Sequence, residues 1–241
     1  MIKENKGSAS NRPLRFAEKH WSEALCINHW AMAVSIFILI ITGIYITKPF
    51  TIGTGETWQK FLMAHVRFFH LVFGLLLVIL FVWRVYLAFF SNFHADWKDF
   101  FAWLNPKNTW HSIKFYTLIT TEPPEHTGLY GSLQAAAYLF LFLIVFIEAV
   151  TGLVLYGALH QAGLAGIIYK AFGPVERWIF GGLAGTRYTH HILTWLFIIF
   201  IMIHVYLSFW YERIFKQGII SSIVNGLFFK DAEDQHIIKE E

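Results

Sequence analysis

Four long runs with very few charged residues dominate this chain of 241 residues. We expect membrane-spanning helices at about 24–47, 65–90, 129–156 and 188–211. Each run approaches or exceeds the roughly 20 residues that cross a bilayer. Within lipid the backbone must satisfy its own hydrogen bonds, so these segments should be helical. The sequence therefore predicts an all-α integral membrane four-helix bundle, a single domain over 1–241 with polar tails at 1–23 and 212–241.

The composition supports this class and excludes several kinds of metal site. Hydrophobic residues make up 56% of the chain and aromatic residues 19%, which is typical of membrane proteins. The positive charges cluster at the ends of the apolar runs, so they do not indicate nucleic-acid binding. Cys26 is the only cysteine, which excludes a disulfide framework, an iron–sulfur ligand set and covalent haem attachment. A metal would have to be held by some of the twelve histidines.

Lysine and arginine are unevenly divided between the two sides of the predicted bundle. Thirteen of them lie in the two tails and in the connection between the second and third runs, whereas six lie on the opposite side. Cytoplasmic segments carry an excess of positive residues. This bias predicts that the N and C termini are both cytoplasmic.

The fourth run carries two histidines, His190 and His204, fourteen residues apart. Fourteen steps of about 100° leave them within about 40° on one helix face and about 21 Å apart along the axis. His70 lies early in the second run, at the depth of His190 in the outer leaflet. His29 lies early in the first run at the depth of His204, in the inner leaflet. Depth therefore predicts the pairs His70 with His190 and His29 with His204.

Each pair could hold a haem iron from two sides. Two imidazole ligands leave no open coordination position, so such centres transfer electrons rather than bind oxygen. Arg67 and Arg187 each lie one helical turn outside a histidine, where they could meet haem propionates or simply anchor the helix at the interface. The alternative from another class is a haem-free bundle, a transporter whose histidines conduct protons or bind metal.

Other polar residues of the apolar runs are less easily assigned. His191 competes with His190, but it lies about 100° round the helix and far from the face of His204. His65 lies on another face than His70, nearer the water, and suits a loop or mouth position. Glu148 could pair with a buried cation, conduct protons or remain protonated with a hydrogen bond, and the sequence does not choose among these.

The dipeptide Thr-Gly occurs in the first and the third run, as Thr42-Gly43 and Thr151-Gly152. Small residues let helices, or a flat macrocycle, approach closely. We interpret both dipeptides as ordinary helix-packing positions.

A set of short motifs follows in a fixed order along nearly the whole chain. They are His29-Trp30, Thr42-Gly43, Lys48-Pro49, Arg67-x-x-His70, Thr151-Gly152, Leu155-Tyr156, His190, His204-Val205-Tyr206 and Ser222-Ile-Val-Asn225-Gly226. Each motif is weak alone, but the ordered set resembles the b-type cytochrome subunit of membrane-bound respiratory (uptake) nickel–iron hydrogenases. The nearest rival resemblance is the cytochrome b subunit of formate dehydrogenase or of another periplasmic oxidoreductase.

The resemblance implies a transmembrane cytochrome b domain in the bacterial cytoplasmic (inner) membrane, with two non-covalent haem b groups. The family's iron ligands match His29, His70, His190 and His204. The implied partners are the small and large subunits of the hydrogenase, and the electron acceptor is menaquinone or ubiquinone. The chain would then be the electron-transfer subunit of a hydrogen:quinone oxidoreductase complex. His126 resembles a family histidine implicated in quinone reduction, as a catalytic proton donor, although a surface histidine in a Pro-rich turn is the alternative.

Overall fold

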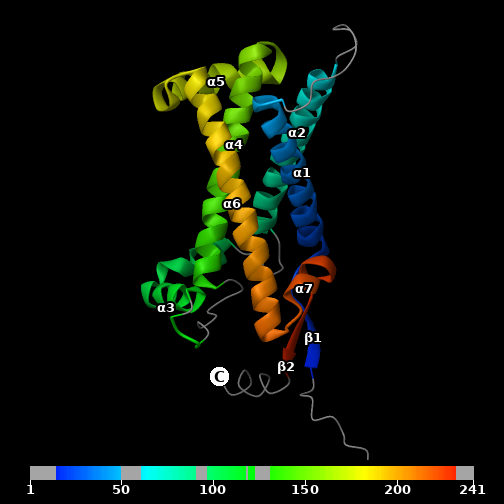
Figure 1. Ribbon diagram of the computed structural model, residues 1–241, viewed down its shortest axis with the longest axis vertical. Helices are drawn as coiled ribbons and strands as arrows, with labels where there is room; N and C mark the ends of the chain where they lie inside the picture. The colour runs from blue at the N-terminus through cyan, green and yellow to red at the C-terminus, as the bar shows by residue number, and fades with distance from the viewer. Residues whose placement is uncertain (1–14, 50–60, 91–96, 118, 123–130, 232–241) are drawn as a thin grey trace, which may run out of the picture.

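Four long helices span the molecule from end to end (Figure 1). The computed structural model describes residues 15–49, 61–90, 97–117, 119–122 and 131–231. The spanning helices are α1 (Glu23–Thr47), α2 (Leu62–Phe90), α4 (Ser132–Leu159) and α6 (Leu183–Phe215). All four are long and apolar enough to cross a membrane, as the hydropathy of the sequence predicted.

The helix ends differ from the predicted boundaries by a few residues. Helix α2 begins at Leu62 rather than 65, and α4 covers Ser132–Leu159 rather than 129–156. Helix α6 is longer than predicted at both ends, since 188–211 becomes Leu183–Phe215. Hydropathy marks the lipid-buried part of a helix, whereas backbone hydrogen bonding continues through the polar residues at the interface.

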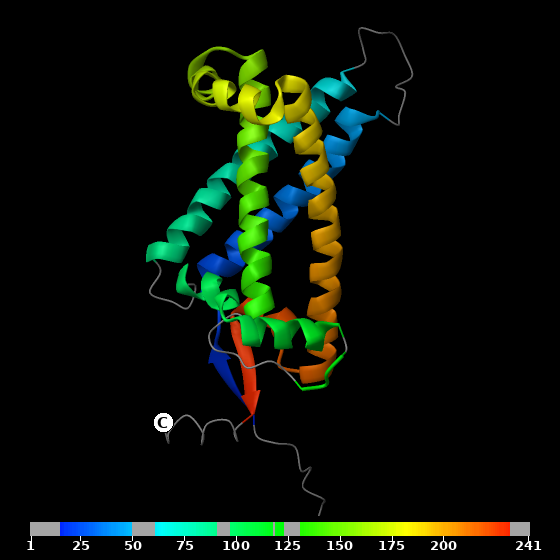
Figure 2. The same cartoon turned by 90° about the vertical axis from the view of Figure 1, so that its left-hand side faces the viewer.

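The spanning helices are arranged as two packed groups. Helix α1 packs along α2, and α4 packs against α6, while backbone contacts between α6 and the α1–α2 group are few. Figure 2 shows α1 and α2 running obliquely past the more upright α4 and α6. The backbones of α6 and of the α1–α2 group are therefore far enough apart for side chains to lie between them.

Shorter helices cover the two ends of the bundle. Helix α5 (Gly163–Phe180) lies across one end, and α3 (Pro106–Tyr116) lies across the other (Figures 1 and 2). The 3₁₀ helix η2 (Trp97–Leu104) packs beside α4 near α3. Helix α3 begins with a capping residue, because the Asn105 side chain caps it and Pro106 occupies its first turn.

A small β pair joins the two described ends of the chain, in a region predicted to be polar tail. Strand β1 (Arg15–Lys19) pairs antiparallel with β2 (Leu227–Asp231), which follows helix α7 (Ile219–Asn225). The Trp21 indole N–H donates to Ser222 Oγ (3.3 Å), and the Trp30 indole N–H donates to the Ile223 carbonyl (3.1 Å). We call β1, α7 and β2 the terminal clasp.

The segments that we predicted only as polar tails therefore contain the two paired strands, because hydropathy cannot detect a strand pairing between distant segments. The terminal clasp also places both described ends of the chain at one end of the bundle, opposite α5 (Figure 1). A chain that crosses the membrane an even number of times has both of its ends on the same side.

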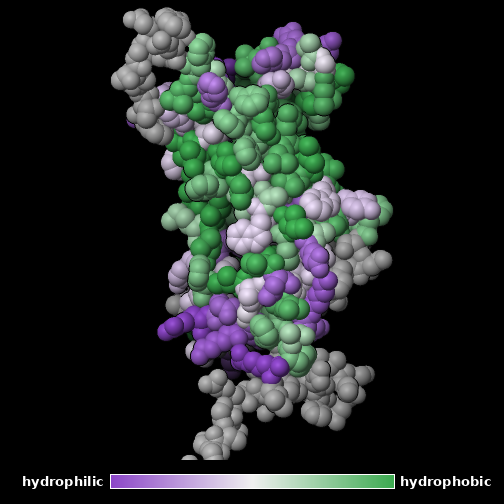
Figure 3. Space-filling model, turned by 90° about the vertical axis from the view of Figure 1, so that its right-hand side faces the viewer, coloured by the Kyte–Doolittle hydropathy of each residue, from purple (hydrophilic) through white to green (hydrophobic). Residues whose placement is uncertain are grey.

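Apolar side chains cover the middle of the face that Figure 3 shows. Large hydrophobic side chains are exposed on every spanning helix, among them Phe37, Ile79, Phe146 and Met202. Polar side chains gather toward the ends. Exposed apolar surface of this extent marks contact with lipid rather than water.

Candidate functional site

The structure brings the four predicted histidines together in two pairs at two levels of the bundle. The rings of His70 (α2) and His190 (α6) have centroids 6.4 Å apart with planes at 73°; we call these residues the α5-side pair. The rings of His29 (α1) and His204 (α6) have centroids 6.3 Å apart with planes at 49°; we call these the termini-side pair. Both pairs connect α6 to the α1–α2 group, across the gap where backbone contacts are few.

The ring separations match what one shared metal ion requires. With metal–imidazole bonds of about 2.0 Å and roughly 1.1 Å from nitrogen to ring centre, two rings on opposite sides of one ion have centroids about 6.2 Å apart. If the two imidazoles of each pair were hydrogen-bonded directly to each other, this separation of the ring centroids would not be needed at both levels. The donor set of both pairs therefore fits a haem iron held from two sides.

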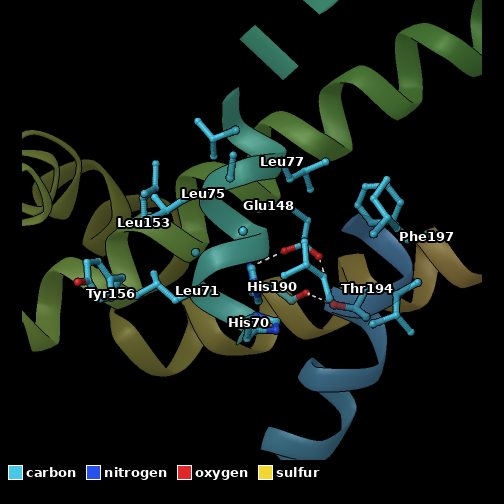
Figure 4. Close-up of a pocket in the computed structure, with 17 residues that line it drawn as sticks. His70, Leu71, Leu75, Leu77, Glu148, Leu153, Tyr156, His190, Thr194 and Phe197 are labelled. Carbon is cyan, nitrogen blue, oxygen red and sulfur yellow. Dashed lines mark hydrogen bonds and ion pairs between the residues drawn. The ribbon is translucent and has the colours of Figure 1, made fainter. Parts of the chain in front are cut away.

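A cavity surrounds the α5-side pair. Its volume is about 120 Å³. All four spanning helices line it, and apart from the two histidines its walls are mainly apolar, with Leu71, Leu75 and Leu153 labelled in Figure 4. The chemistry of this wall suits a flat apolar group that is held at its centre by the imidazoles.

A threonine on α1 orients the His70 ring. Thr42 Oγ1 lies 2.8 Å from His70 Nδ1, and the Thr42 hydroxyl donates its own proton to the Ile38 carbonyl (2.7 Å). Its oxygen must therefore accept from His70 Nδ1–H. The proton on Nδ1 leaves Nε2 with a free lone pair, which is the protonation state that a metal ligand needs.

The same arrangement recurs between α4 and α6. Thr151 Oγ1 lies 2.9 Å from His190 Nδ1, and the Thr151 hydroxyl donates to the Ile147 carbonyl (2.7 Å). By the same argument Nδ1 of His190 carries the proton and Nε2 is free to bind a metal. The threonines of α1 and α4 therefore hold His70 and His190 in the same tautomer.

The glycine of each Thr-Gly dipeptide makes room for the same ring. A Cβ added at Gly43 would lie 3.3 Å from His70 Cε1, and one at Gly152 would lie 3.3 Å from His190 Cε1. Contacts this short are tighter than most Cβ contacts, so each ring would have to move by a few tenths of an ångström. We interpreted both dipeptides as helix-packing positions, but the structure shows that each holds and accommodates one histidine.

Glu148 is a further member of the site that the sequence left unassigned. Its side chain is only 8% exposed, and Oε2 contacts His190 Nδ1. Its other oxygen accepts a hydrogen bond from Thr194 Oγ1 (3.3 Å). Figure 4 shows the carboxyl group pointing at α6 between these two residues. A carboxyl about one helical turn before Thr151-Gly152 was the signal that could have placed it beside His190.

The termini-side pair has different neighbours. His29 Nδ1 is buried and has no hydrogen-bond partner among the described residues. Trp30 meets the His29 ring edge-on (centroids 5.4 Å apart), and Phe200 stacks on His204 (5.7 Å, planes at 9°). A buried imidazole nitrogen without a partner is costly for the protein alone. Its surroundings here are aromatic rather than hydroxyl-rich.

The competing histidines are engaged elsewhere. Nε2 of His191 accepts from the Trp195 indole N–H (3.3 Å), so its ring belongs to another face of α6 than that of His190. His65 is exposed at the start of α2, where Nδ1 lies 2.9 Å from the Phe61 carbonyl. Neither ring faces a second histidine among the described residues.

The remaining predicted residues are less constrained. Arg67 and Arg187 are exposed at the α5 end, one turn outside His70 and His190, and within the described part of the chain neither forms a hydrogen bond or an ion pair. His126 lies outside the described residues.

Known proteins are similar to this chain over most of its length. Residues 20–226 match the family model of the prokaryotic cytochrome b561 proteins. The chain is 32% identical to a probable Ni/Fe-hydrogenase B-type cytochrome subunit of Rhizobium leguminosarum bv. viciae, over 86% of this chain and 87% of that protein. It is 33% identical to the corresponding protein of Azotobacter vinelandii, over 84% of this chain and 85% of that protein.

A more distant relative is the probable Ni/Fe-hydrogenase 1 B-type cytochrome subunit of Escherichia coli (strain K12). It is 26% identical over 82% of this chain and 85% of that protein. The family implies haem b and a role in electron transfer, in agreement with the four spans of a multi-pass membrane protein. The chain therefore belongs to the prokaryotic cytochrome b561 family, together with the b-type cytochrome subunits of Ni/Fe hydrogenases.

Proposed function

We propose that this protein is the di-haem cytochrome b that anchors a periplasmic nickel–iron hydrogenase and passes its electrons to the quinone pool. The observation that carries the proposal is the pair of histidine couples, with ring centroids 6.4 and 6.3 Å apart, at two levels of the same four helices. The names of the relatives support the hydrogenase as the electron source.

The α5-side pair would hold one haem b and the termini-side pair the other. When bound, each haem would supply one-electron transfer, because two imidazole ligands would leave no position open for a substrate. His190 and His204 lie fourteen residues apart on α6, so the two levels are about 21 Å apart along its axis. This spacing makes the protein a conductor across most of the membrane.

Arg67 and Arg187 would bind the propionates of the α5-side haem. Both lie one helical turn outside a ligand histidine, and both are exposed at the α5 end. A guanidinium forms paired, charge-assisted hydrogen bonds with a carboxylate. These arginines would set the orientation of the macrocycle in the cavity, with its charged edge toward the α5 surface.

The α5 end would face the periplasm and the end with the terminal clasp would face the cytoplasm. Positive residues favour this orientation, since thirteen lysines and arginines lie on the side of the termini and six on the other. The small and large hydrogenase subunits would then dock at the α5 end, close to the α5-side pair. The membrane would be the bacterial cytoplasmic (inner) membrane.

Quinone reduction would take place near the termini-side pair. The connection that contains His126 precedes α4, and its described flanks, Glu122 and Gly131, join α3 and α4 at the clasp end. We propose His126 as the proton donor to reduced menaquinone or ubiquinone, because an imidazole with an ordinary pKa donates protons near neutral pH. His126→Ala should slow quinone reduction while hydrogen still reduces both haems; full quinone activity would contradict this role.

The ligand assignment is tested by comparing neighbouring histidines in the purified complex. His190→Ala should leave one haem b per chain, and His204→Ala should leave a different one, as judged by haem content and reduced absorption bands. His191→Ala is the matched control on α6 and should keep both. Two haems in His190→Ala would overturn the assignment, and a wild-type protein without haem would favour a proton or metal transporter.

A further inference from the structure

We propose that Glu148 is a positioning residue that acts through His190 and lowers the reduction potential of the α5-side haem below that of the termini-side haem. This inference rests on the proposed ligation of two haems by the two histidine pairs. It adds a role for a residue that binds no iron. Among the described residues, the α5-side pair is the only one that has a carboxyl group against an imidazole.

The first step is the position of the Glu148 side chain. It is 8% exposed and lies on the face of α4 that meets α6. Oε2 contacts His190 Nδ1, and Oε1 accepts from Thr194 Oγ1, one helical turn further along α6. Figure 4 shows the carboxyl group held between the two side chains. Glu148 is therefore fixed by two contacts to α6, one of which is the ligand histidine.

The second step is the direction of the hydrogen bonds. The Thr151 hydroxyl donates to the Ile147 carbonyl, so its oxygen accepts from His190. His190 therefore carries its proton on Nδ1. Nδ1–H therefore donates to Thr151 Oγ1, and Glu148 Oε2 contacts the same nitrogen. The Thr194 hydroxyl lies 3.3 Å from Glu148 Oε1 and 3.1 Å from the His190 carbonyl oxygen, so these two oxygens share its proton. Glu148 therefore faces an N–H group with one oxygen and a hydroxyl with the other, which is an environment that suits a carboxylate. No described lysine or arginine pairs with it.

The third step is the effect on a bound metal. A carboxylate that accepts from the outer nitrogen of a ligand imidazole makes the ring a stronger electron donor to the metal. A negative charge near the iron, in surroundings of low dielectric constant, also favours the more positive, oxidised state. Both effects lower the reduction potential. His70 lacks this influence, because no carboxyl group of the described residues contacts its ring and its Nδ1–H lies against the neutral hydroxyl of Thr42.

The consequence is a preferred direction for the electron. In the transfer between the two haems, the α5-side iron goes from ferrous to ferric and the termini-side iron goes from ferric to ferrous, so one electron moves and the charges balance. The hydrogenase and the quinone of the proposed function supply and remove that electron. A lower potential at the α5-side pair makes transfer toward the clasp end favourable.

A purely structural role for Glu148 is the competing explanation, since a buried carboxyl could simply join α4 to α6. Glu148→Gln separates the two roles, because glutamine keeps the shape and can still accept from Thr194, but has no charge. Glu176→Gln is the matched control. Glu176 is also buried (4% exposed) and accepts from Thr186 Oγ1 (2.5 Å), but it joins α5 to α6 away from the rings.

The experiment is a redox titration of both haems in the intact complex, with the α5-side haem identified as the one that His190→Ala removes. In Glu148→Gln both haems should remain, and the equilibrium constant for transfer toward the termini-side haem should fall at least tenfold. That factor corresponds to a rise of about 59 mV in the α5-side potential for one electron. The electron paramagnetic resonance signal of the same haem should also shift. Glu176→Gln should change neither potential.

A second variant keeps the test decisive if Glu148→Gln does not assemble. Glu148→Asp retains the charge but shortens the side chain by one methylene, so its α5-side potential should rise by a smaller amount. Unchanged potentials in whichever variant retains both haems would overturn the inference and leave the ligand assignment intact. Retention of both haems in His190→Ala would instead refute the proposed function on which the inference rests.

Discussion

The α5-side pair and the termini-side pair have almost the same ring separation but different surroundings. Their centroids are 6.4 and 6.3 Å apart. On the α5 side, each histidine donates to a threonine hydroxyl and lies against a glycine, and His190 also meets a carboxyl group. On the clasp side, the neighbours are aromatic rings, and His29 Nδ1 has no partner within the described part of the chain.

This comparison separates two tasks that the helices perform. The separation of the rings is set by how α6 is held against the α1–α2 group, and it is common to both levels. The neighbours of each ring are set by single residues of one helix, and they differ between the levels. Ligand spacing and electronic tuning can therefore be changed independently, and variants that affect only one pair test this separation.

The largest expected effect comes from filling the space that His190 occupies. A Cβ at Gly152 would already lie 3.3 Å from the ring, so Gly152→Leu should displace the ligand and remove the α5-side haem. The termini-side haem should remain, which haem content and reduced spectra would show. Gly173→Ala is the control, because its Cβ would lie at an ordinary 3.5 Å from Tyr169. Two normal haems in Gly152→Leu would contradict the close contact.

Removing the threonine acceptors should weaken one pair and spare the other. Thr42→Val and Thr151→Val each take away the group that holds a histidine tautomer, and the loss of such a partner lowers metal affinity by about 10–100-fold. Haem release from the α5-side pair should accelerate accordingly, while Thr42→Ser restores retention. Thr47→Val is the control, since the Thr47 hydroxyl donates to the Gly43 carbonyl and contacts no histidine of the described residues. Equal losses from both pairs would argue against the tautomer role.

A variant of the terminal clasp should affect the termini-side pair and spare the α5-side pair. Gly226 has φ +79°, and a Cβ there would lie 2.7 Å from the Trp21 carbonyl oxygen. Gly226→Ala should destabilise the clasp by at least the roughly 1–2 kcal/mol of a left-handed non-glycine residue. Because Trp30 joins the clasp to α1 beside His29, heating should release the termini-side haem first. Gly163→Ala, which has φ +60° but open space around it, should not do so.

The smallest expected effects concern the arginines at the α5 end. Arg67→Gln or Arg187→Gln should weaken retention of the α5-side haem by up to about 1 kcal/mol, because exposed ion pairs contribute little. Higher salt should reduce the difference from wild type. Arg177→Gln, an exposed residue on α5, is the control. The same loss in that variant, or a loss from the termini-side pair, would refute a propionate contact.

The spans and the histidine pairs could be predicted because they depend on properties of one helix at a time. Hydropathy marks the spans, and helical periodicity with depth sorts His29, His70, His190 and His204 into the pairs that the structure brings together. The choice of His190 over His191 also followed from periodicity alone. These predictions required no knowledge of which helices are neighbours.

The roles of the Thr-Gly dipeptides and of Glu148 could not be predicted in the same way. Periodicity indicates the face of a residue but not the helix that the face meets. Only the packing of α1 on α2 and of α4 on α6 places Thr42 beside His70, and Glu148 beside His190. The terminal clasp could not be predicted for a similar reason, because its two short strands are far apart in the sequence.

The most direct test of the account is the haem content of the wild-type protein, measured as its pyridine haemochrome against protein concentration, together with the spin state of the iron. We expect two haem b groups per chain, both low-spin with two axial imidazoles. Fewer than two haems, or iron in the high-spin state with an open position, would contradict the claim that both histidine pairs hold a haem.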